Sequence, residues 1–130
     1  HCCDGVYIAG YNDSANPDTP LSDVFGVARN INAQYNSRQG MSLTGGQNIS
    51  FYDCTFDNTG LPEFSVQSLP KSGVDIEEEI SQIRNITFTR CYFGKSGGLS
   101  MVADAGRIKA VKFYDCTIVD KTYIEIFSFH

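Results

Sequence analysis

The sequence has no tryptophan, only four prolines and two methionines, and only two histidines, at positions 1 and 130. Without an internal histidine, mechanisms that use one as general base are excluded. No apolar run is long enough to cross a membrane, and helical periodicity is nearly absent. Only residues 75–84 are rich in helix-forming side chains, and they lie between two predicted strands.

Basic residues are also scarce: the sequence has 10 Lys and Arg against 15 Asp and Glu, which gives a net charge of −5. This balance argues against a nucleic-acid partner, because no excess of basic charge is available to displace counterions from phosphates. An anionic polysaccharide stays open, because scattered basic residues can line one groove. The candidates are Arg29, Arg38, Arg84, Arg90, Lys95 and Arg107.

What the sequence does contain is a nine-residue phrase that occurs three times. It reads NISFYDCTF at 48–56, NITFTRCYF at 85–93 and AVKFYDCTI at 110–118, with starts 37 and then 25 residues apart. In each copy apolar residues alternate with polar ones, as a strand with one buried face requires. Short strands at such offsets predict a solenoid, in which each repeat buries its apolar face against its neighbours.

A second pattern, apolar-variable-apolar and mostly after a glycine, accompanies the first. It occurs at 5–8, 40–43, 73–76, 98–101 and 123–126. One coil thus has three short strands, which predicts an all-β fold, a single-stranded parallel β-helix of about five coils spaced about 4.8 Å apart. An antiparallel sandwich is the weaker alternative, because its hairpins would need two-residue turn signals and the period would be accidental.

Inward positions of successive coils are predicted to stack along the axis. The expected stacks are Ile49–Ile86–Val111, Phe51–Phe88–Phe113, Cys54–Cys91–Cys116 and Val74–Leu99–Ile124. An earlier coil begins near Ser22 and places Phe25 and Val27 in its first strand. The sequence allows two registers for its bend that differ by one residue, and an asparagine takes the cysteine position.

The five cysteines show no Cys-x-x-Cys or Cys/His spacing, so no metal site is predicted. Three of them share the inward slot of one stack, where a small, soft apolar side chain packs well. We therefore predict buried, reduced thiols at Cys54, Cys91 and Cys116. Reduced thiols and an odd cysteine count fit folding in a reducing cytosol.

A chain of 130 residues is one domain, here a single β-helix segment over residues 1–130 with loop insertions at 10–22 and 57–72. The sequence starts within a coil and stops after a third strand, without polar caps at either end. Open solenoid ends expose strand edges and core. We expect a segment of a longer helix that continues into further coils and is not a soluble monomer alone.

The stretches 5–8, 38–42 (RQGMS), 48–56 and 72–77 (SGVDIE) together resemble the pectate-lyase-like right-handed β-helix superfamily, and most of all phage tailspike polysaccharide depolymerases. The resemblance covers nearly the whole chain. It implies a right-handed helix, commonly a homotrimer, whose outer face binds and cleaves bacterial surface polysaccharide. It also implies a virion tail, secreted or cell-surface location. Of the catalytic residues, only Asp75 and Glu77 are carried over as suspects.

The outward residue of the second pattern is Tyr7, Ser42, Asp75, Ser100 and Glu125 in successive coils, and this row is expected to face solvent. Asp75 and Glu125 are two coils apart, roughly 9.6 Å. That is near the separation of about 6.5–9.5 Å in inverting glycosidases. Glu77, about 6.6 Å along the strand from Asp75, is the other candidate partner. One carboxyl of either pair needs a raised pKa to act as the acid.

The 57–72 loop directly precedes Asp75, and loop insertions in solenoids build binding surfaces. Tyr11 and Phe64 are candidates for stacking on sugar rings, and Arg38 and Tyr7 complete the predicted substrate-binding set. For Phe64, packing onto the coil beneath is an open alternative.

Three functions follow as expectations. The favoured one is a glycoside hydrolase without a cofactor, acting through the paired carboxylates. A polysaccharide lyase would use Arg38 or Arg107 as base, with calcium held by Asp75, Glu77 and Asp104. The third is a non-catalytic carbohydrate-binding or spacer segment of a larger fibre.

Overall fold

The computed structural model describes residues 4–9, 26–64, 69–77, 83–99, 101–103, 108–119 and 122–124. Within these ranges there are thirteen β-strands and no helix. The strands are β1 (Val6–Ile8), β2 (Gly26–Arg29), β3 (Asn32–Gln34), β4 (Met41–Leu43), β5 (Gly46–Tyr52), β6 (Thr55–Asp57), β7 (Val74–Ile76), β8 (Ile83–Thr89), β9 (Tyr92–Phe93), β10 (Met101–Ala103), β11 (Lys109–Tyr114), β12 (Thr117–Ile118) and β13 (Thr122–Ile124). No helix able to span a membrane occurs in the described part of the chain.

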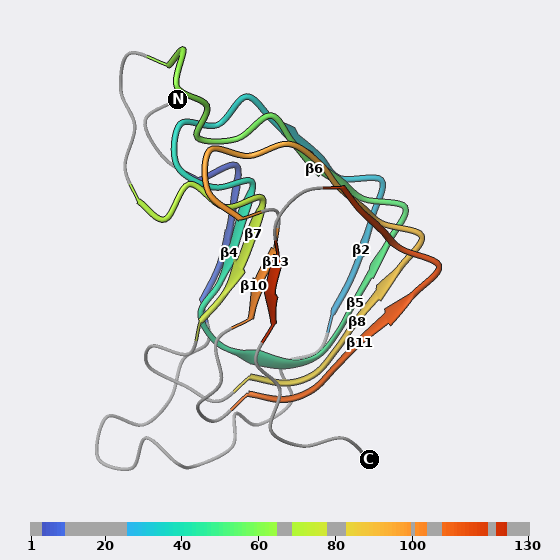
Figure 1. Ribbon diagram of the computed structural model, residues 1–130. Coiled ribbons are helices and arrows are strands. Elements are labelled where there is room, and N and C mark those ends of the chain that lie inside the picture. Colours follow the sequence, from blue (N-terminus) through green and yellow to red (C-terminus); the bar gives the residue numbers. More distant parts are fainter. Residues whose placement is uncertain are drawn as a thin grey trace, which may run out of the picture.

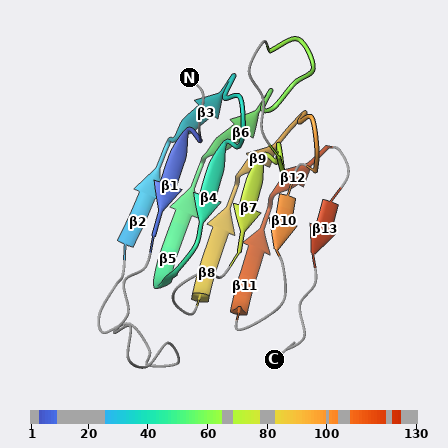
Figure 2. The same cartoon turned by 90° about the vertical axis from the view of Figure 1, so that its left-hand side faces the viewer.

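The strands form three sheets in which every pairing is parallel. Sheet A has the order β1-β4-β7-β10-β13, sheet B β2-β5-β8-β11 and sheet C β3-β6-β9-β12. The chain visits A, B and C in turn, so each passage, or coil, lies on the one before (Figures 1 and 2). The predicted all-β class with parallel strands is confirmed, and the antiparallel sandwich is wrong.

The core between the three sheets is a ladder of like side chains. Phe51, Phe88 and Phe113 are register partners, and their rings stack with centroids 4.8 and 5.3 Å apart. Phe93 from sheet C meets the Phe88 ring edge-on at 5.4 Å. Offset-stacked and edge-on contacts are the geometries that aromatic quadrupoles favour. The predicted phenylalanine stack is confirmed, as is the pairing of Ile49 and Val111 with the isoleucine between them, Ile86.

A single residue turns the chain from sheet B to sheet C in each coil. These corner residues have positive φ: Asn30 (56°), Asp53 (55°), Arg90 (52°) and Asp115 (51°). Asn and Asp tolerate the left-handed region better than other side chains do. Arg90 is the exception, and its guanidinium donates to both carboxylate oxygens of Asp53 at 2.7 and 3.0 Å.

The cysteines follow the corner and face the core. Cys54 and Cys91 are buried and Cys116 is half-buried, and all three are free thiols. Cys91 Sγ lies 3.7 Å from the Phe51 carbonyl oxygen of the previous coil, and Cys116 Sγ lies 3.4 Å from that of Phe88. Burial raises the pKa of the Cys91 thiol to about 12, so this thiol stays protonated and unreactive.

Two register predictions are wrong. In the earliest coil Ala28, not Val27, pairs with Phe51, and Val27 points outward with 64 % of its surface exposed. The residue after the corner is then Ile31, which takes the cysteine position in place of an asparagine. In sheet A the partners of Val74 are Met101 and then Thr122, so the predicted Val74–Leu99–Ile124 stack does not form.

The predicted loop at 57–72 also starts one residue too early, because Asp57 is the last residue of β6. Asp57 Oδ1 accepts hydrogen bonds from the backbone N–H groups of Asn58 and Lys95, which ties this loop to the next coil. The insertion at 10–22 and Phe25 lie outside the described residues.

We expect Phe88→Ala to lower the free energy of unfolding by about 3–5 kcal/mol, because it removes a fully buried ring from the centre of the stack and leaves a cavity. Denaturant unfolding followed by tyrosine fluorescence measures this loss. Val119→Ala, at a position 58 % exposed, is the control and should change stability by less than about 0.5 kcal/mol. Equal effects of the two substitutions would contradict the stacked core.

Candidate functional site

The outward row of sheet A contains the favoured carboxylate. Tyr7, Ser42 and Asp75 are register partners, as predicted. The row continues with Val102 and Tyr123, whereas Ser100 and Glu125 lie outside the described residues. The position two coils from Asp75 therefore belongs to Tyr123, and the register that paired Asp75 with Glu125 is wrong.

The row was expected to face solvent, and this is wrong at its centre. Ser42 is 3 % and Asp75 5 % exposed, although Tyr7 at the end of the row is 56 % exposed. The cover comes from the chain that enters β4, where Gln39 is fully buried. A polar side chain of this size stays buried only when its amide is hydrogen-bonded.

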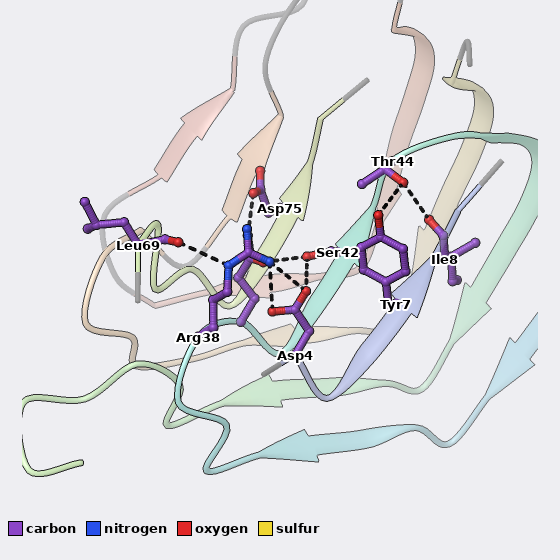
Figure 3. A network of polar contacts seen from close by, with 9 residues as sticks. Asp4, Tyr7, Ile8, Arg38, Ser42, Thr44, Leu69 and Asp75 are labelled. Carbon is purple, nitrogen blue, oxygen red and sulfur yellow. Dashed lines mark hydrogen bonds and ion pairs between the residues drawn. The ribbon is translucent and has the colours of Figure 1, made fainter. Parts of the chain in front are cut away.

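Arg38, beside Gln39, ties three successive coils together (Figure 3). Its Nη1 donates to Asp4, 3.1 Å from Oδ2 and 3.3 Å from Oδ1, just before β1. Its Nε donates to the Leu69 carbonyl oxygen at 3.1 Å, in the loop before β7. Asp4 is 7 % exposed and Arg38 36 %, so the ion pair closes the outer side of the site.

Gln39 joins Ser42 to Asp75. Its Nε2 donates to Asp75 Oδ2, and its Oε1 lies within hydrogen-bonding distance of the Ser42 hydroxyl. The same hydroxyl lies 2.6 Å from Asp4 Oδ2. Two acceptors thus compete for one Ser42 proton.

Protonation of Asp75 resolves this competition. If the Gln39 amide turns over, its NH₂ donates to the Ser42 oxygen, Ser42 donates to Asp4, and Gln39 Oε1 accepts the proton of a neutral Asp75. Every donor then has its own acceptor. The orientation of this amide is therefore coupled to the charge of Asp75.

The electrostatics of the site favour the neutral form of Asp75. Burial, and then the charge of Glu77, raise the pKa of Asp75 from 3.8 to about 6, although the Gln39 hydrogen bond and the Arg38 charge oppose the shift. Asp4 adds a further small increase. A carboxyl that titrates near pH 6 can hold and release a proton under physiological conditions.

Glu77 differs from Asp75 in exposure. It follows β7, donates its backbone N–H to the Leu43 carbonyl oxygen at 3.0 Å, and is exposed. Alternation along the chain puts its side chain on the same side as that of Asp75. One face thus carries a buried carboxyl and an exposed one, an asymmetry that suits different acid and base roles.

The other predicted residues are spread more widely. Phe64 is half-buried in a turn closed by its N–H and the Leu61 carbonyl oxygen, 3.0 Å apart. The Tyr7 hydroxyl accepts a hydrogen bond from Thr44 Oγ1 at 3.3 Å, at the far end of its strand (Figure 3). Tyr11, Asp104 and Arg107 lie outside the described residues. No group of three or more His, Cys, Asp or Glu suited to a metal occurs in the part of the chain that is described.

Sequence reasoning missed Asp4, Gln39 and Ser42 as parts of the site, although a signal exists. Asp4, Gln39 and Ser72 each precede the glycine that opens a strand of sheet A, and Gly5 N–H donates to Gln39 O at 3.0 Å. A Cβ on Gly40 would lie 2.5 Å from the Gly73 carbonyl oxygen, so the coils approach too closely here for a side chain. A polar residue before each such glycine marks a buried polar row.

Comparison of this chain with protein-family models, with curated proteins and with solved structures finds no match. The function is therefore argued from the site itself.

We expect the contribution of Asp75 to the stability of the protein to fall as the pH rises from about 4 to about 6. Because the folded-state pKa of Asp75, about 6, exceeds 3.8, the folded protein keeps a proton that the unfolded chain releases. At neutral pH, burial of the charged Asp75 carboxylate lowers the free energy of unfolding by on the order of 2 kcal/mol, allowing for partial screening by solvent. Asp75→Asn should remove this component, which denaturant unfolding at several pH values measures. Glu63→Gln, on an exposed loop position, should leave the profile unchanged.

We further expect Gln39→Leu to raise the pKa of Asp75 above its value in the unaltered protein. The substitution removes the hydrogen bond that favours the carboxylate. A carboxyl ¹³C NMR titration of Asp75 measures the change, with Gln34→Leu as control, since the Gln34 amide donates to Asn32 Oδ1 at 2.6 Å in an exposed position. An unchanged Asp75 titration in Gln39→Leu would contradict the contact.

Proposed function

We propose that the chain is a right-handed parallel β-helix. Support comes from the cyclic order of the strands, since the chain passes through sheets A, B and C before it returns to A. Parallel strands in one sheet joined by a crossover connection are right-handed in nearly all proteins. A homotrimer and a place on a virion tail or cell surface are predictions that follow from the resemblance.

We propose that this β-helix hydrolyses glycosidic bonds of a bacterial polysaccharide at Asp75. The observation that carries the proposal is a buried carboxyl with a pKa of about 6 beside an exposed carboxyl on the same face. Asp75 is the general acid that protonates the leaving oxygen, and Glu77 is the base that activates water. The Cα atoms of residues two apart on a strand are about 6.6 Å apart, so side chains on the same face can place their carboxyl groups at the separation of about 6.5–9.5 Å used by inverting enzymes.

Access to Asp75 requires a small opening. The hydrogen bond between Arg38 and the Leu69 carbonyl is exposed, and breaking one such bond costs about 0.5–1.5 kcal/mol. Its release would remove one tether of Arg38 and allow the adjoining Gln39, which covers Asp75, to move outward. A polysaccharide that offers new contacts to the loop can supply this energy.

The lyase alternative is less well supported. Its base would be Arg38 or Arg107; the Arg38 guanidinium is engaged in its ion pair with Asp4, and Arg107 lies outside the described residues. The spacer alternative predicts no cleavage at all. Both alternatives are distinguished from hydrolysis by the products.

We expect Asp75→Asn and Glu77→Gln each to lower cleavage of capsular polysaccharides by about 10²–10⁴-fold, the usual contribution of general acid–base catalysis. New reducing ends measure hydrolysis, and the ultraviolet absorbance of an unsaturated uronate reveals a lyase. Polysaccharide binding should persist in both variants, and Glu63→Gln should cleave normally. Undiminished turnover in Asp75→Asn, or no cleavage of any polysaccharide in the panel by the unaltered protein, would refute the proposal.

A further inference from the structure

Charge is segregated among the three sheets. Every Lys or Arg that lies in a described strand lies in sheet B: Arg29, Arg84, Lys109 and Lys112. The strands of sheet B contain no Asp or Glu. The described strands of sheets A and C contain one charged residue each, Asp75 and Asp57. A chain of net charge −5 therefore has one basic sheet.

The described side chains of Arg29 and Lys112 belong to the outer face of sheet B, because the alternate residues of the same strands form the core. Lys112 is exposed and is flanked by the inward residues Val111 and Phe113. Arg29 is exposed beside the inward Ala28. Figure 1 shows the strands of sheet B, β2, β5, β8 and β11, along one outer edge of the molecule.

Aromatic rings and hydroxyl groups lie between the cations. One outward row runs Arg29–Tyr52–Thr89–Tyr114 and the next Val27–Ser50–Thr87–Lys112. The Arg29 guanidinium carbon stands 4.3 Å from the centre of the Tyr52 ring, a cation–π contact that orients it. Tyr114 is 52 % exposed at the other end of the row.

The cations of this face lack acidic partners among the described residues. Among the described residues the ion pairs are Arg38–Asp4, beside sheet A, and Arg90–Asp53, at the corner. Arg29, Arg84 and Lys112 form no ion pair with a described residue, although the charge of Arg29 acts on Asp53 from a distance. Arg84 is half-buried. Its Nε is buried without a hydrogen-bond partner in the described part of the chain, so any contact with a ligand would be made by the rest of the guanidinium.

We propose that the outer face of sheet B binds an anionic polysaccharide that lies along the axis of the molecule across β2, β5, β8 and β11. The outer strands of this sheet are roughly 14 Å apart, a span of a few sugar rings. Carboxylate or sulfate groups would meet Arg29, Arg84 and Lys112, and sugar rings would lie against Tyr52 and Tyr114. Three cations that form no ion pair with any described residue, on a protein of net charge −5, suit a sparsely charged glycan better than a nucleic acid, whose phosphates are closely spaced.

This surface is separate from the carboxyl site on sheet A, and its test does not depend on cleavage. Polygalacturonate, a uronate polymer, serves as the anionic probe, dextran as the neutral one, and a DNA duplex as the competing polyanion. Binding is measured by calorimetry at low and at physiological salt. We expect polygalacturonate to bind, more weakly as salt rises, and dextran not to bind.

A matched pair of variants locates the surface. Lys112→Glu should weaken polygalacturonate binding by about tenfold or more, as loss and reversal of one contact charge predicts. Lys95→Glu makes the same charge change at an exposed lysine of the loop between β9 and β10, and should leave binding unchanged. Tyr114→Ala should also weaken binding, and Asp75→Asn should not. Circular dichroism verifies that each variant is folded.

Three results would overturn the proposal. They are absence of polygalacturonate binding by the unaltered protein, equal weakening by Lys112→Glu and Lys95→Glu, and DNA binding as tight as polygalacturonate binding. If the unaltered protein binds polygalacturonate but cleaves no polysaccharide, only the catalytic proposal is refuted. If it cleaves a polysaccharide but does not bind polygalacturonate, only the binding proposal is refuted.

Discussion

Each coil makes its strand hydrogen bonds with the coils on either side of it, as β5 does with β2 and β8. Parallel pairing holds equivalent residues about 4.8 Å apart, so a side chain of one coil rests on its counterpart in the next. The core then has to be built from rings and chains that stack at that spacing, as Phe51 and Phe88 do at 4.8 Å. Two further features follow from the same spacing. The sharp turn at Asp53, with its positive φ, keeps the corners of successive coils aligned. At Gly40 the coils approach so closely that there is no room for a side chain.

This constraint explains which parts of the fold the sequence predicts. The phenylalanine and isoleucine stacks are readable because the phrase repeats and its apolar residues recur with period two. The prediction that Val27 faces the core is wrong because the earliest copy of the repeated phrase is too divergent to fix its register. A slip of one residue exchanges the two faces of a strand. The error at Leu99 is different. Loops of unequal length precede β10 and β13. The residues 25 positions after Val74 and after Leu99 are therefore not the neighbours of Val74 in the sheet, where Met101 and then Thr122 take these places.

The site was predictable only in part for a related reason. Asp75 stands out as the acidic residue of an otherwise neutral row, and its strand position was predicted correctly. Its burial was not, because the cover is supplied by Gln39, 36 residues away in the chain, and by an arginine that reaches two further loops. A pattern of alternation separates outward from inward residues but does not reveal whether another segment lies over the outward ones. The raised pKa of Asp75 depends on that cover, so a sequence alone gives the residue and not its chemistry.

The same coils separate acidic from basic chemistry. The groups that shift the pKa of Asp75 are Glu77, Gln39, Arg38 and Asp4, all on or beside sheet A, and no cation of sheet B is among them. The exposed cations of sheet B are largely screened by salt from other exposed charges farther away than about 8 Å. Because each coil contributes one strand to each sheet, substitutions on one face can tune binding while the proton-holding carboxyl on another face keeps its environment.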